Sequence, residues 1–365
     1  MMIKMYDFKS QYNKIKEEID SSIQCVLNDS AFSSGKYTQI FENKFSDYIG
    51  SKYCAAVNNG TSALHAALLA LDIKPGDEVL VPSFSFFATC ESVSLTGATP
   101  IFVDSDYQNF NLDLEDLESK INPNTKAIVC VHLYGQSCDM NKLKEITNKY
   151  NLYLIEDAAQ AHGAEYMNKK VGTFGDFSCF SFYPTKNLGA YGEGGAVLTD
   201  NVDYYQKLQS IRNHGSFKQY HHNLIGHNFR MSGFQGAILS VKLNYLDKWN
   251  NIRLSNAKLY NAYLKEISDV QTPKLIDGYK HVFHQYVIKV KNRNLLKEFL
   301  LEKNIDSAIY YPIPCHLQDV YKNKVGSNVI AERLANEVLA LPIAEHINKD
   351  NIEYITDTIC KFYSK

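Results

Sequence analysis

The stretch Ser181-Phe182-Tyr183-Pro184-Thr185-Lys186 is followed, after two residues, by the glycine-rich run Gly189-Ala190-Tyr191-Gly192-Glu193-Gly194-Gly195. It places one lysine behind a short aromatic run, Phe180–Tyr183, and ahead of a tight turn. Aromatic surroundings favour burial of Lys186, and burial lowers the pKa of a lysine toward the range in which its amine is a nucleophile. The glycine run does not match a dinucleotide-binding fingerprint, because the strand-like Ala196-Val197-Leu198-Thr199 follows it instead of a helix. We interpret the glycines as turn residues that shape the loop carrying the lysine.

A second informative segment lies upstream, where Glu156-Asp157-Ala158-Ala159-Gln160 ends the apolar run Leu152–Ile155. Asp157 would stand at the carboxyl end of a strand, where open α/β sheets bind their ligands. Taken alone, Lys186 would be a solvated surface residue and Asp157 a helix cap or a turn carboxylate. Together they supply what pyridoxal phosphate (PLP) chemistry requires. The lysine holds the cofactor aldehyde as a Schiff base and shuttles protons, and the carboxylate keeps the pyridine nitrogen protonated.

Further segments suit the remaining parts of this cofactor. Gly60-Thr61-Ser62 follows a strand-like run and begins a helix, so free N–H groups and the helix dipole there favour a phosphate. An ordinary helix cap is the alternative. Ser181 would add a hydroxyl to the same phosphate. Phe86, in Pro82-Ser83-Phe84-Ser85-Phe86, would stack on the cofactor ring, with plain core packing as the alternative.

Short apolar runs alternate with helical patterns through the first two-thirds of the chain. The expected strands are Tyr53–Val57, Glu78–Val81, Pro100–Val103, Lys126–Val131 and Leu152–Ile155. Helices are expected at 60–71, at 85–95, from about Asp113 and at 141–150. Strands separated by helices indicate βαβ units and therefore a mainly parallel sheet.

The pattern changes after Met231. One long helix is expected at 233–264, followed by strands at 284–290 and 308–311, a helix at 295–303 and two C-terminal helices. This order predicts two domains. Residues 1–240 form a large PLP-binding α/β domain, and residues 241–365 form a smaller α/β domain that the long helix joins to it.

The 365-residue chain has 45% hydrophobic and 21% charged residues and a net charge of −2. These values give no reason to expect nucleic acid or an acidic membrane surface as a partner. No apolar run approaches the roughly 18 residues of a membrane span, and the N-terminus lacks the apolar core of a signal peptide. The eight cysteines form no CxxC pair, so we expect reduced core thiols and a cytoplasmic location. His221, His222 and His227 have no zinc-site spacing, so we expect no metal.

Together these residues resemble the DegT/DnrJ/StrS family of PLP-dependent sugar aminotransferases. The likeness covers essentially the whole chain. Its other motifs are Ser34-Gly35, Asn59-Gly60-Thr61-Ser62-Ala63-Leu64, Glu156-Asp157-Ala158-Ala159-Gln160 and Gly226-His227-Asn228-Phe229-Arg230-Met231. The resemblance implies fold type I, the aspartate aminotransferase-like α/β fold, with a large, mainly parallel sheet domain and a smaller C-terminal α/β domain.

The resemblance also implies roles for single residues. Lys186 would form the Schiff base with PLP, Asp157 would pair with the pyridine nitrogen, and Gln160 would lie against the ring hydroxyl. Phe86 would stack on the ring. The phosphate would be held where the helix begins and at the end of the lysine strand, by Gly60, Thr61, Ser62 and Ser181.

Asn228, by the same resemblance, would reach the phosphate of the neighbouring subunit. This implies a homodimer with two shared active sites, in which the loop 215–230 is the crossing segment. Some relatives are sugar 3-dehydratases that carry a histidine in place of the Schiff-base lysine. Because this chain has Lys186, transamination is favoured, with L-glutamate as the amino donor and pyridoxamine phosphate as the intermediate form of the cofactor.

Two segments bear on the substrate. His281-Val282-Phe283-His284-Gln285-Tyr286 and Tyr310-Tyr311-Pro312-Ile313-Pro314-Cys315-His316-Leu317-Gln318 look like those of the subgroup that aminates C3 of dTDP-3-oxo-6-deoxyhexoses, giving dTDP-3-amino-3,6-dideoxyhexoses. Relatives that act on uronic acid sugars tend to have Asn-Lys in place of His316-Leu317. For the second segment, a proline-rich turn with a structural histidine is the alternative. The side chains expected to contact substrate are Tyr183, Lys218, Arg230 and His316, with His162 as a further candidate.

Three other functions stay open at this point. The first is a C4 aminotransferase that acts on a nucleotide-linked 4-oxo sugar. The second is a PLP lyase or racemase, which would turn over without an amino acceptor. The third is a non-catalytic, PLP-binding regulator of the same fold; the intact Lys186 and Asp157 argue against it.

Overall fold

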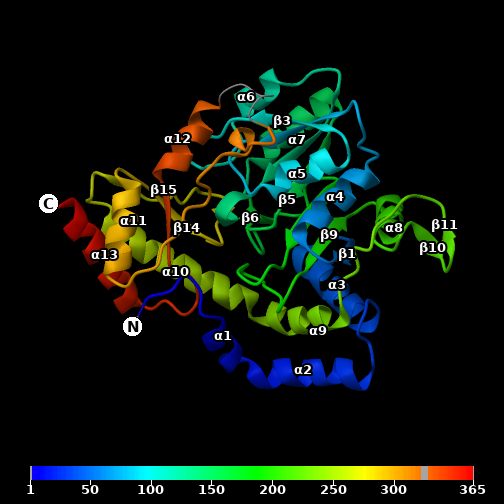
Figure 1. Ribbon diagram of the computed structural model, residues 1–365, viewed down its shortest axis with the longest axis horizontal. Coiled ribbons are helices and arrows are strands. Elements are labelled where there is room, and N and C mark those ends of the chain that lie inside the picture. The colour runs from blue at the N-terminus through cyan, green and yellow to red at the C-terminus, as the bar shows by residue number, and fades with distance from the viewer. Residues whose placement is uncertain (1, 322–327, 365) are drawn as a thin grey trace.

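The computed structural model describes residues 2–321 and 328–364, and its centre is a seven-stranded sheet (Figure 1). The strand order is β1-β9-β8-β5-β4-β2-β3. The strands are β1 (Tyr53–Val57), β2 (Glu78–Pro82), β3 (Thr99–Val103), β4 (Thr125–Val131), β5 (Tyr153–Asp157), β8 (Phe177–Ser181) and β9 (Gly195–Thr199). Strand β9 is antiparallel to both of its neighbours, and the other four pairings are parallel. The expected mainly parallel sheet is confirmed.

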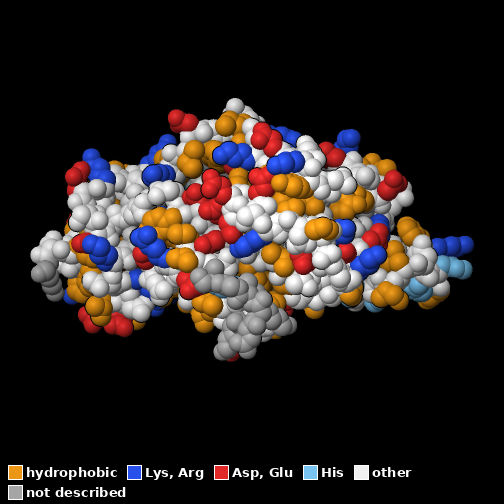
Figure 2. Space-filling view, turned by 90° about the horizontal axis from the view of Figure 1, so that it is seen from above, with side chains coloured by type: hydrophobic (Ala, Val, Ile, Leu, Met, Phe, Trp, Pro, Cys, Tyr) orange, Lys and Arg blue, Asp and Glu red, His pale blue; other side chains and the backbone are white. Residues whose placement is uncertain are grey.

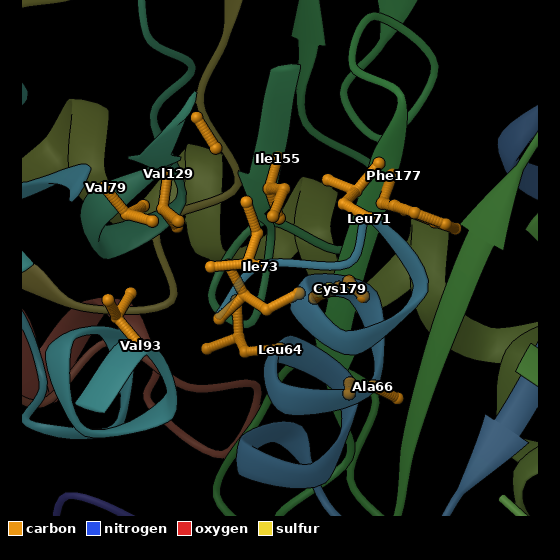
Figure 3. Packing of buried hydrophobic residues seen from close by; sticks show 14 of the residues in the cluster. Leu64, Ala66, Leu71, Ile73, Val79, Val93, Val129, Ile155, Phe177 and Cys179 are labelled. Atoms are coloured by element: carbon orange, nitrogen blue, oxygen red, sulfur yellow. The ribbon is translucent and has the colours of Figure 1, made fainter. Parts of the chain in front are cut away.

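Helices cover both faces of this sheet, because successive side chains of a strand point to opposite faces. On one face, α4 (Gly60–Ala70), α5 (Ala88–Leu95) and α8 (Val202–Ile211) pack on residues such as Val79 and Val129. Figure 3 shows Leu64 and Ala66 of α4 and Val93 of α5 against these strands. The other face is covered by α3 (Lys36–Ile49), α6 (Leu114–Ser119), α7 (Met140–Tyr150) and α9 (Gly233–Lys242).

The expected elements of this part agree closely with the structure. Strands β1 to β5 lie where the apolar runs place them, and Asp113 is the N-cap of α6. The exception is α5, which begins at Ala88 and not at Ser85. Residues 83–87 instead form a loop that leaves the carboxyl end of β2. This loop carries Phe86 beside the ends of the neighbouring strands.

The prediction of one long helix at 233–264 is wrong in one respect. Helix α9 ends at Lys242, a 3-10 turn follows at Leu243–Tyr245, and α10 (Leu246–Leu264) then begins. No proline or glycine marks the break, and Leu239, Leu243 and Leu246 all join the same core cluster. The helical apolar pattern therefore continues through the turn and hides it.

The C-terminal part contains a three-stranded antiparallel sheet in the order β12 (Val270–Gln271), β14 (Tyr286–Val290), β15 (Val338–Leu341). Helices α10, α11 (Arg293–Glu302) and α13 (Lys349–Tyr363) enclose its core, and α12 (Val329–Glu337) precedes β15. The two C-terminal helices are confirmed. The strand expected at 308–311 is wrong, because only a single bridge joins Ala308 to Ala340.

The remaining elements are the N-terminal helices and several short strands and turns. They are α1 (Phe8–Lys14), α2 (Lys16–Asn28), β6 (Glu165–Tyr166), β7 (Lys169–Lys170), β10 (Ser216–Lys218), β11 (His221–His222), β13 (Tyr279–Lys280) and the 3-10 turns Leu133–Gly135 and Cys315–Leu317. At the N-terminus, the Ile3 N–H donates to the Asn304 carbonyl over 2.9 Å. The first residues thus pack on the C-terminal part, and the division at residue 240 stays a prediction.

Candidate active site

The loop between β8 and β9 carries Lys186. The Lys186 N–H donates to the Tyr183 carbonyl over 2.9 Å, which closes the turn, and Phe182 exchanges backbone bonds of 2.7 Å with Gly194 and Ala190. A Cβ atom on Gly189 would collide with the Pro184 carbonyl. Only glycine fits that position, so the interpretation of the glycine run as turn geometry is confirmed there.

Burial sets the chemistry of the Lys186 amine. Loss of solvation lowers its pKa to about 8, and the Asp157 carboxylate acts in the opposite direction. The side chain keeps partial contact with solvent. An amine with this pKa is still mostly protonated at neutral pH, but its neutral fraction is far larger than that of an ordinary lysine. Lys186 is therefore a ready nucleophile.

Asp157 lies buried at the end of β5. The Thr89 hydroxyl donates to its Oδ2 over 2.9 Å, and the Ala159 N–H donates to Oδ1 over 3.2 Å. Burial raises the pKa of Asp157, while these two bonds and the Lys186 charge lower it. Sequence reasoning missed Thr89. The Ser85 hydroxyl lies 3.0 Å from that of Thr89, but no local pattern in the sequence links Thr89 to Asp157.

Gln160 and Phe86 lie on different loops, and both contact Tyr311. Gln160 Nε2 donates to the Tyr311 hydroxyl over 3.0 Å, and its Oε1 accepts from the Tyr134 N–H over 2.8 Å. The ring of Phe86 is 56% exposed and tilted against that of Tyr311, with centroids 5.9 Å apart. This exposure does not fit plain core packing and leaves one face of Phe86 free to stack on a ligand. Tyr311 lies in a segment that the sequence links to substrate, but its contact with Gln160 was not foreseen.

The start of α4 meets the end of β8. A Cβ atom on Gly60 would lie 2.7 Å from the Ser181 Cβ and 3.1 Å from its Oγ. The Asn59 side chain caps the helix by accepting from the Ser62 N–H over 2.8 Å. The structure thus brings Gly60 and Ser181 together, as the predicted phosphate site requires, at an N-terminus that favours anions.

Residues 228–230 lie beside the same helix start. The Asn58 N–H donates to the Phe229 carbonyl over 2.8 Å, and Arg230 Nη1 donates to Asn213 over 2.6 Å. Asn228 forms a backbone bridge with Asn213. The role of Asn228 across a subunit boundary, and that of Arg230 in substrate binding, stay predictions.

Lys218 lies at the tip of the β10–β11 hairpin, which projects from the body of the molecule (Figure 1). Figure 2 shows lysine and histidine side chains gathered at this projecting end. Lys218, His221 and His222 are exposed there. A substrate contact of Lys218 stays a prediction.

The other expected substrate contacts differ in accessibility. Tyr183 is 48% exposed at the start of the lysine turn, so its ring is available to a ligand. His316 is 1% exposed, with Nε2 3.2 Å from Glu332, which favours the structural alternative for this histidine. His162 has no exposed surface and lies among the rings of Phe180 and Phe182, which does not fit a direct substrate contact.

These residues fit PLP by the chemistry of their groups. The site offers a nucleophilic amine, a buried carboxylate, an exposed aromatic face and an anion-binding helix start. In the described ranges, 2–321 and 328–364, no cluster of three or more His, Cys, Asp or Glu side chains is arranged to hold a metal. Within the same ranges, every helix is too short or too polar to cross a bilayer.

Comparisons with known proteins identify the family of the chain. Residues 13–360 match the model of the DegT/DnrJ/EryC1/StrS aminotransferase family. The chain is 42% identical to a protein of Geobacillus stearothermophilus named a pleiotropic regulatory protein, with 100% of this chain and 99% of the relative covered. It is 41% identical to the dTDP-3-amino-3,6-dideoxy-α-D-galactopyranose transaminase of Aneurinibacillus thermoaerophilus, with 99% of each chain covered. Further relatives are named for UDP- and GDP-linked sugars.

Solved structures carry the same fold. The crystal structure of Streptomyces venezuelae DesV, described as a complex with a ketimine intermediate, is 35% identical and superposes with a TM-score of 0.97. That superposition covers 100% of this chain and 99% of DesV. The expected fold type I is confirmed. The chain therefore belongs to the DegT/DnrJ/EryC1/StrS aminotransferase family.

Proposed function

We propose that this chain is a PLP-dependent aminotransferase that moves the amino group of L-glutamate to the C3 keto group of a dTDP-3-oxo-6-deoxyhexose. The observation that carries the proposal is the Lys186 amine, held on a glycine-shaped turn with a pKa lowered to about 8 by burial and coupled to the Asp157 carboxylate. When bound, the cofactor supplies an electron sink for electrons released at the amino acid Cα.

The chain's own residues then divide the work. Lys186 would hold the cofactor through its amine, and the free amine would move a proton as a general base and acid. Asp157 would supply the negative charge that pairs with the pyridine nitrogen, and Thr89 supports that charge with its 2.9 Å bond. Phe86 would stack on the cofactor ring, and Gln160 would lie near the ring hydroxyl. The phosphate would be held by Gly60, Thr61, Ser62 and Ser181.

The C3 position and the dTDP nucleotide rest on narrower support. The support is the Tyr310–Gln318 segment and the 41% identity to a transaminase whose name specifies a dTDP-3-amino sugar. A homodimer with shared sites is part of the same proposal. It is supported by the β10–β11 hairpin of the loop 215–230, which projects from the body of the molecule.

The first test follows the visible absorption of the purified protein with PLP, before and after L-glutamate. We expect the band of the lysine-bound cofactor to disappear and the pyridoxamine phosphate band to appear. A lysine-bound band that glutamate leaves unchanged would argue for a lyase or a regulator. Regulation is the role that the name of the Geobacillus relative gives to that protein. Absence of the band in the wild type would refute the role of Lys186.

The second test identifies the substrate. The pyridoxamine form is offered dTDP-3-oxo-6-deoxyhexose, the 4-oxo isomer and the UDP-linked 3-oxo sugar, and the products are analysed by NMR. We expect a new C–N bond at C3 and fastest return of the PLP band with the dTDP-3-oxo sugar. A product aminated at C4 would establish the alternative C4 aminotransferase.

A further inference from the structure

The residue after the candidate nucleophile makes a complete set of buried hydrogen bonds. Asn187 is buried, and its Nδ2 donates to Asn250 Oδ1 over 2.8 Å and to the Val282 carbonyl over 2.9 Å. Its Oδ1 lies 3.2 Å from His284 Nδ1. Asn250 Nδ2 donates in turn to the His162 carbonyl over 2.8 Å. Three segments that are distant in sequence therefore meet at the Asn187 amide, and Asn250 connects them to a fourth at His162.

The donor count fixes the state of His284. The two acceptors of Nδ2 fix the orientation of the Asn187 amide, so the atom that faces His284 is Oδ1. An amide oxygen only accepts, so the proton must come from His284 Nδ1. Burial and the nearby Lys186 charge both lower the pKa of His284, which keeps the ring neutral. A neutral ring with its proton on Nδ1 matches what Asn187 requires. Every polar atom of the Asn187 side chain is therefore satisfied, and buried polar networks of this kind are costly to break.

This network lies immediately beside an amine that has little else to hold it. Among the described residues, the Lys186 amine makes no hydrogen bond, and the turn is closed by the backbone bond to Tyr183. Asn187 connects that turn to α10 through Asn250 and to the residues before β14 through Val282. Fixing Asn187 therefore fixes the backbone from which the Lys186 side chain extends.

We propose that Asn187 is a positioning residue that holds the Lys186 amine in its buried place beside Asp157. The charged groups that act on this amine are Asp157 from β5 and, when protonated, His162 and His284. Loss of the Asn187 bonds loosens the turn and admits water to the amine. The protonated form then regains solvation, and the pKa of Lys186 rises toward that of an ordinary lysine. The importance of the amine rests on the proposed function, but its pKa can be measured without cofactor.

The test measures acetylation of Lys186 by trace acetic anhydride between pH 6 and pH 11, quantified by peptide mass spectrometry on the cofactor-free protein. We expect a midpoint near pH 8 for the wild type. For Asn187→Ala we expect a rise of about one pH unit or more. Asn250→Ala removes one of the three Asn187 bonds and should shift the midpoint less, in the same direction.

Asn256→Ala is the matched control. Asn256 is also a buried asparagine of α10, and its Nδ2 donates to the Ile343 and Ile347 carbonyls over 3.2 and 3.1 Å, away from the lysine turn. It should destabilise the protein without moving the midpoint. If Asn187→Ala does not fold, Asn250→Ala carries the test. Midpoints of the folded variants equal to the wild type would overturn the proposal.

A separate arm distinguishes this inference from the proposed function. Wild-type protein is mixed with PLP and reduced with borohydride, and the labelled peptide is identified. Label on Lys186 supports the proposed function. Label on another lysine would refute it, while the acetylation midpoints would still report on Asn187.

Discussion

Burial of Lys186 lowers the stability of the folded protein at pH values where its amine is charged. In the unfolded chain Lys186 has an ordinary pKa of about 10.4, and in the folded chain burial lowers it to about 8. Below pH 8 the folded protein must bury an ammonium group, which costs free energy. The unfolded chain binds more protons than the folded one between these two values, so this cost disappears as the pH rises from about 8 to 10.4.

We therefore expect Lys186→Met to abolish transamination and to raise the free energy of unfolding by roughly 1–3 kcal/mol at pH 7. The gain should shrink as the pH rises through the range from about 8 to 10.4. Urea denaturation of the cofactor-free proteins at pH 7 and pH 10 measures it. A gain of equal size at both pH values would show that the amine is not buried in its charged form.

Thr89 is expected to protect the charge of Asp157. Thr89→Val keeps the shape of the side chain and removes the hydroxyl that donates to Oδ2. Because that bond lowers the pKa of Asp157, its loss raises the pKa and lets the carboxylate protonate at higher pH. We expect kcat/KM to fall roughly 10- to 100-fold, with the acidic limb of its pH profile moved to higher pH.

Ser92→Ala is the control for this substitution. Ser92 is buried on the same helix, and its hydroxyl donates to the Thr89 carbonyl over 3.1 Å without touching Asp157. Its pH profile should match that of the wild type. An unchanged acidic limb in Thr89→Val would contradict the role given to Thr89.

Residue type explains which site residues the sequence could reveal. Lys186 and Asp157 stand out because a lysine in an aromatic run and a carboxylate after an apolar run are unusual on their own. Thr89 and Asn187 are ordinary core polar residues in the sequence. Their importance depends on contacts with residues 68 and 63 positions away, which no local pattern carries.

At the scale of elements, helix α4 contributes to the site through its N-terminal end. Its N-cap Asn59 holds the first turn in place, and this turn forms the predicted phosphate site beside Ser181. We expect Asn59→Ala to cost about 1 kcal/mol of unfolding free energy and to weaken PLP binding about five- to tenfold, because a frayed first turn no longer aims its N–H groups at the phosphate.

Asn201→Ala separates stability from binding in this experiment. Asn201 caps α8 by accepting from the Asp203 and Tyr204 N–H groups over 2.8 and 3.1 Å. It should cost similar stability and leave the PLP dissociation constant unchanged, as measured by titration of absorbance. Equal PLP affinity in both variants would contradict the assignment of the phosphate to α4.

Elements were predictable where the apolar pattern and its turn residues agreed. Strands β1 to β5 follow short apolar runs bounded by turn residues, so their positions were found. The break between α9 and α10 was missed because leucines continue at helical spacing through residues 243–245. Bridge formation at Ala308 depends on Ala340, and residues 308–311 alone could not show that the pairing stops after one residue.

At the scale of the molecule, the sheet order gathers the site at one edge. Asp157 ends β5, Ser181 ends β8, α4 begins after β1, and the Phe86 loop leaves β2. Parallel strands present these carboxyl ends together, where open α/β sheets bind ligands. Strand β9 is antiparallel and pairs directly with β8, so the chain from Ser181 to Gly195 needs no crossover helix and stays at that edge. The segment 181–195 thus contains the lysine turn and leads directly into β9, the antiparallel strand of the sheet.

The proposed homodimer makes a prediction about mixed subunits. If Asn228 of one chain completes the phosphate site of the other, each site takes Lys186 from one chain and Asn228 from its partner. The substitutions Lys186→Ala and Asn228→Ala then remove groups that different chains contribute to a site. Hybrid dimers then contain one intact site and one doubly damaged site. We expect an equal mixture, exchanged by unfolding and refolding, to recover up to about a quarter of the wild-type transamination rate per chain.

Lys186→Ala mixed with Asp157→Ala is the matched control for this experiment. Lys186 and Asp157 interact within one chain, so every site of their hybrids lacks one of the two groups. That mixture should recover no activity, because subunit exchange cannot reunite the amine and the carboxylate. Native mass spectrometry of tagged subunits must show hybrids in both mixtures. No recovery from the Lys186→Ala and Asn228→Ala hybrids, beyond the residual rate of Asn228→Ala alone, would assign Asn228 to the site of its own chain.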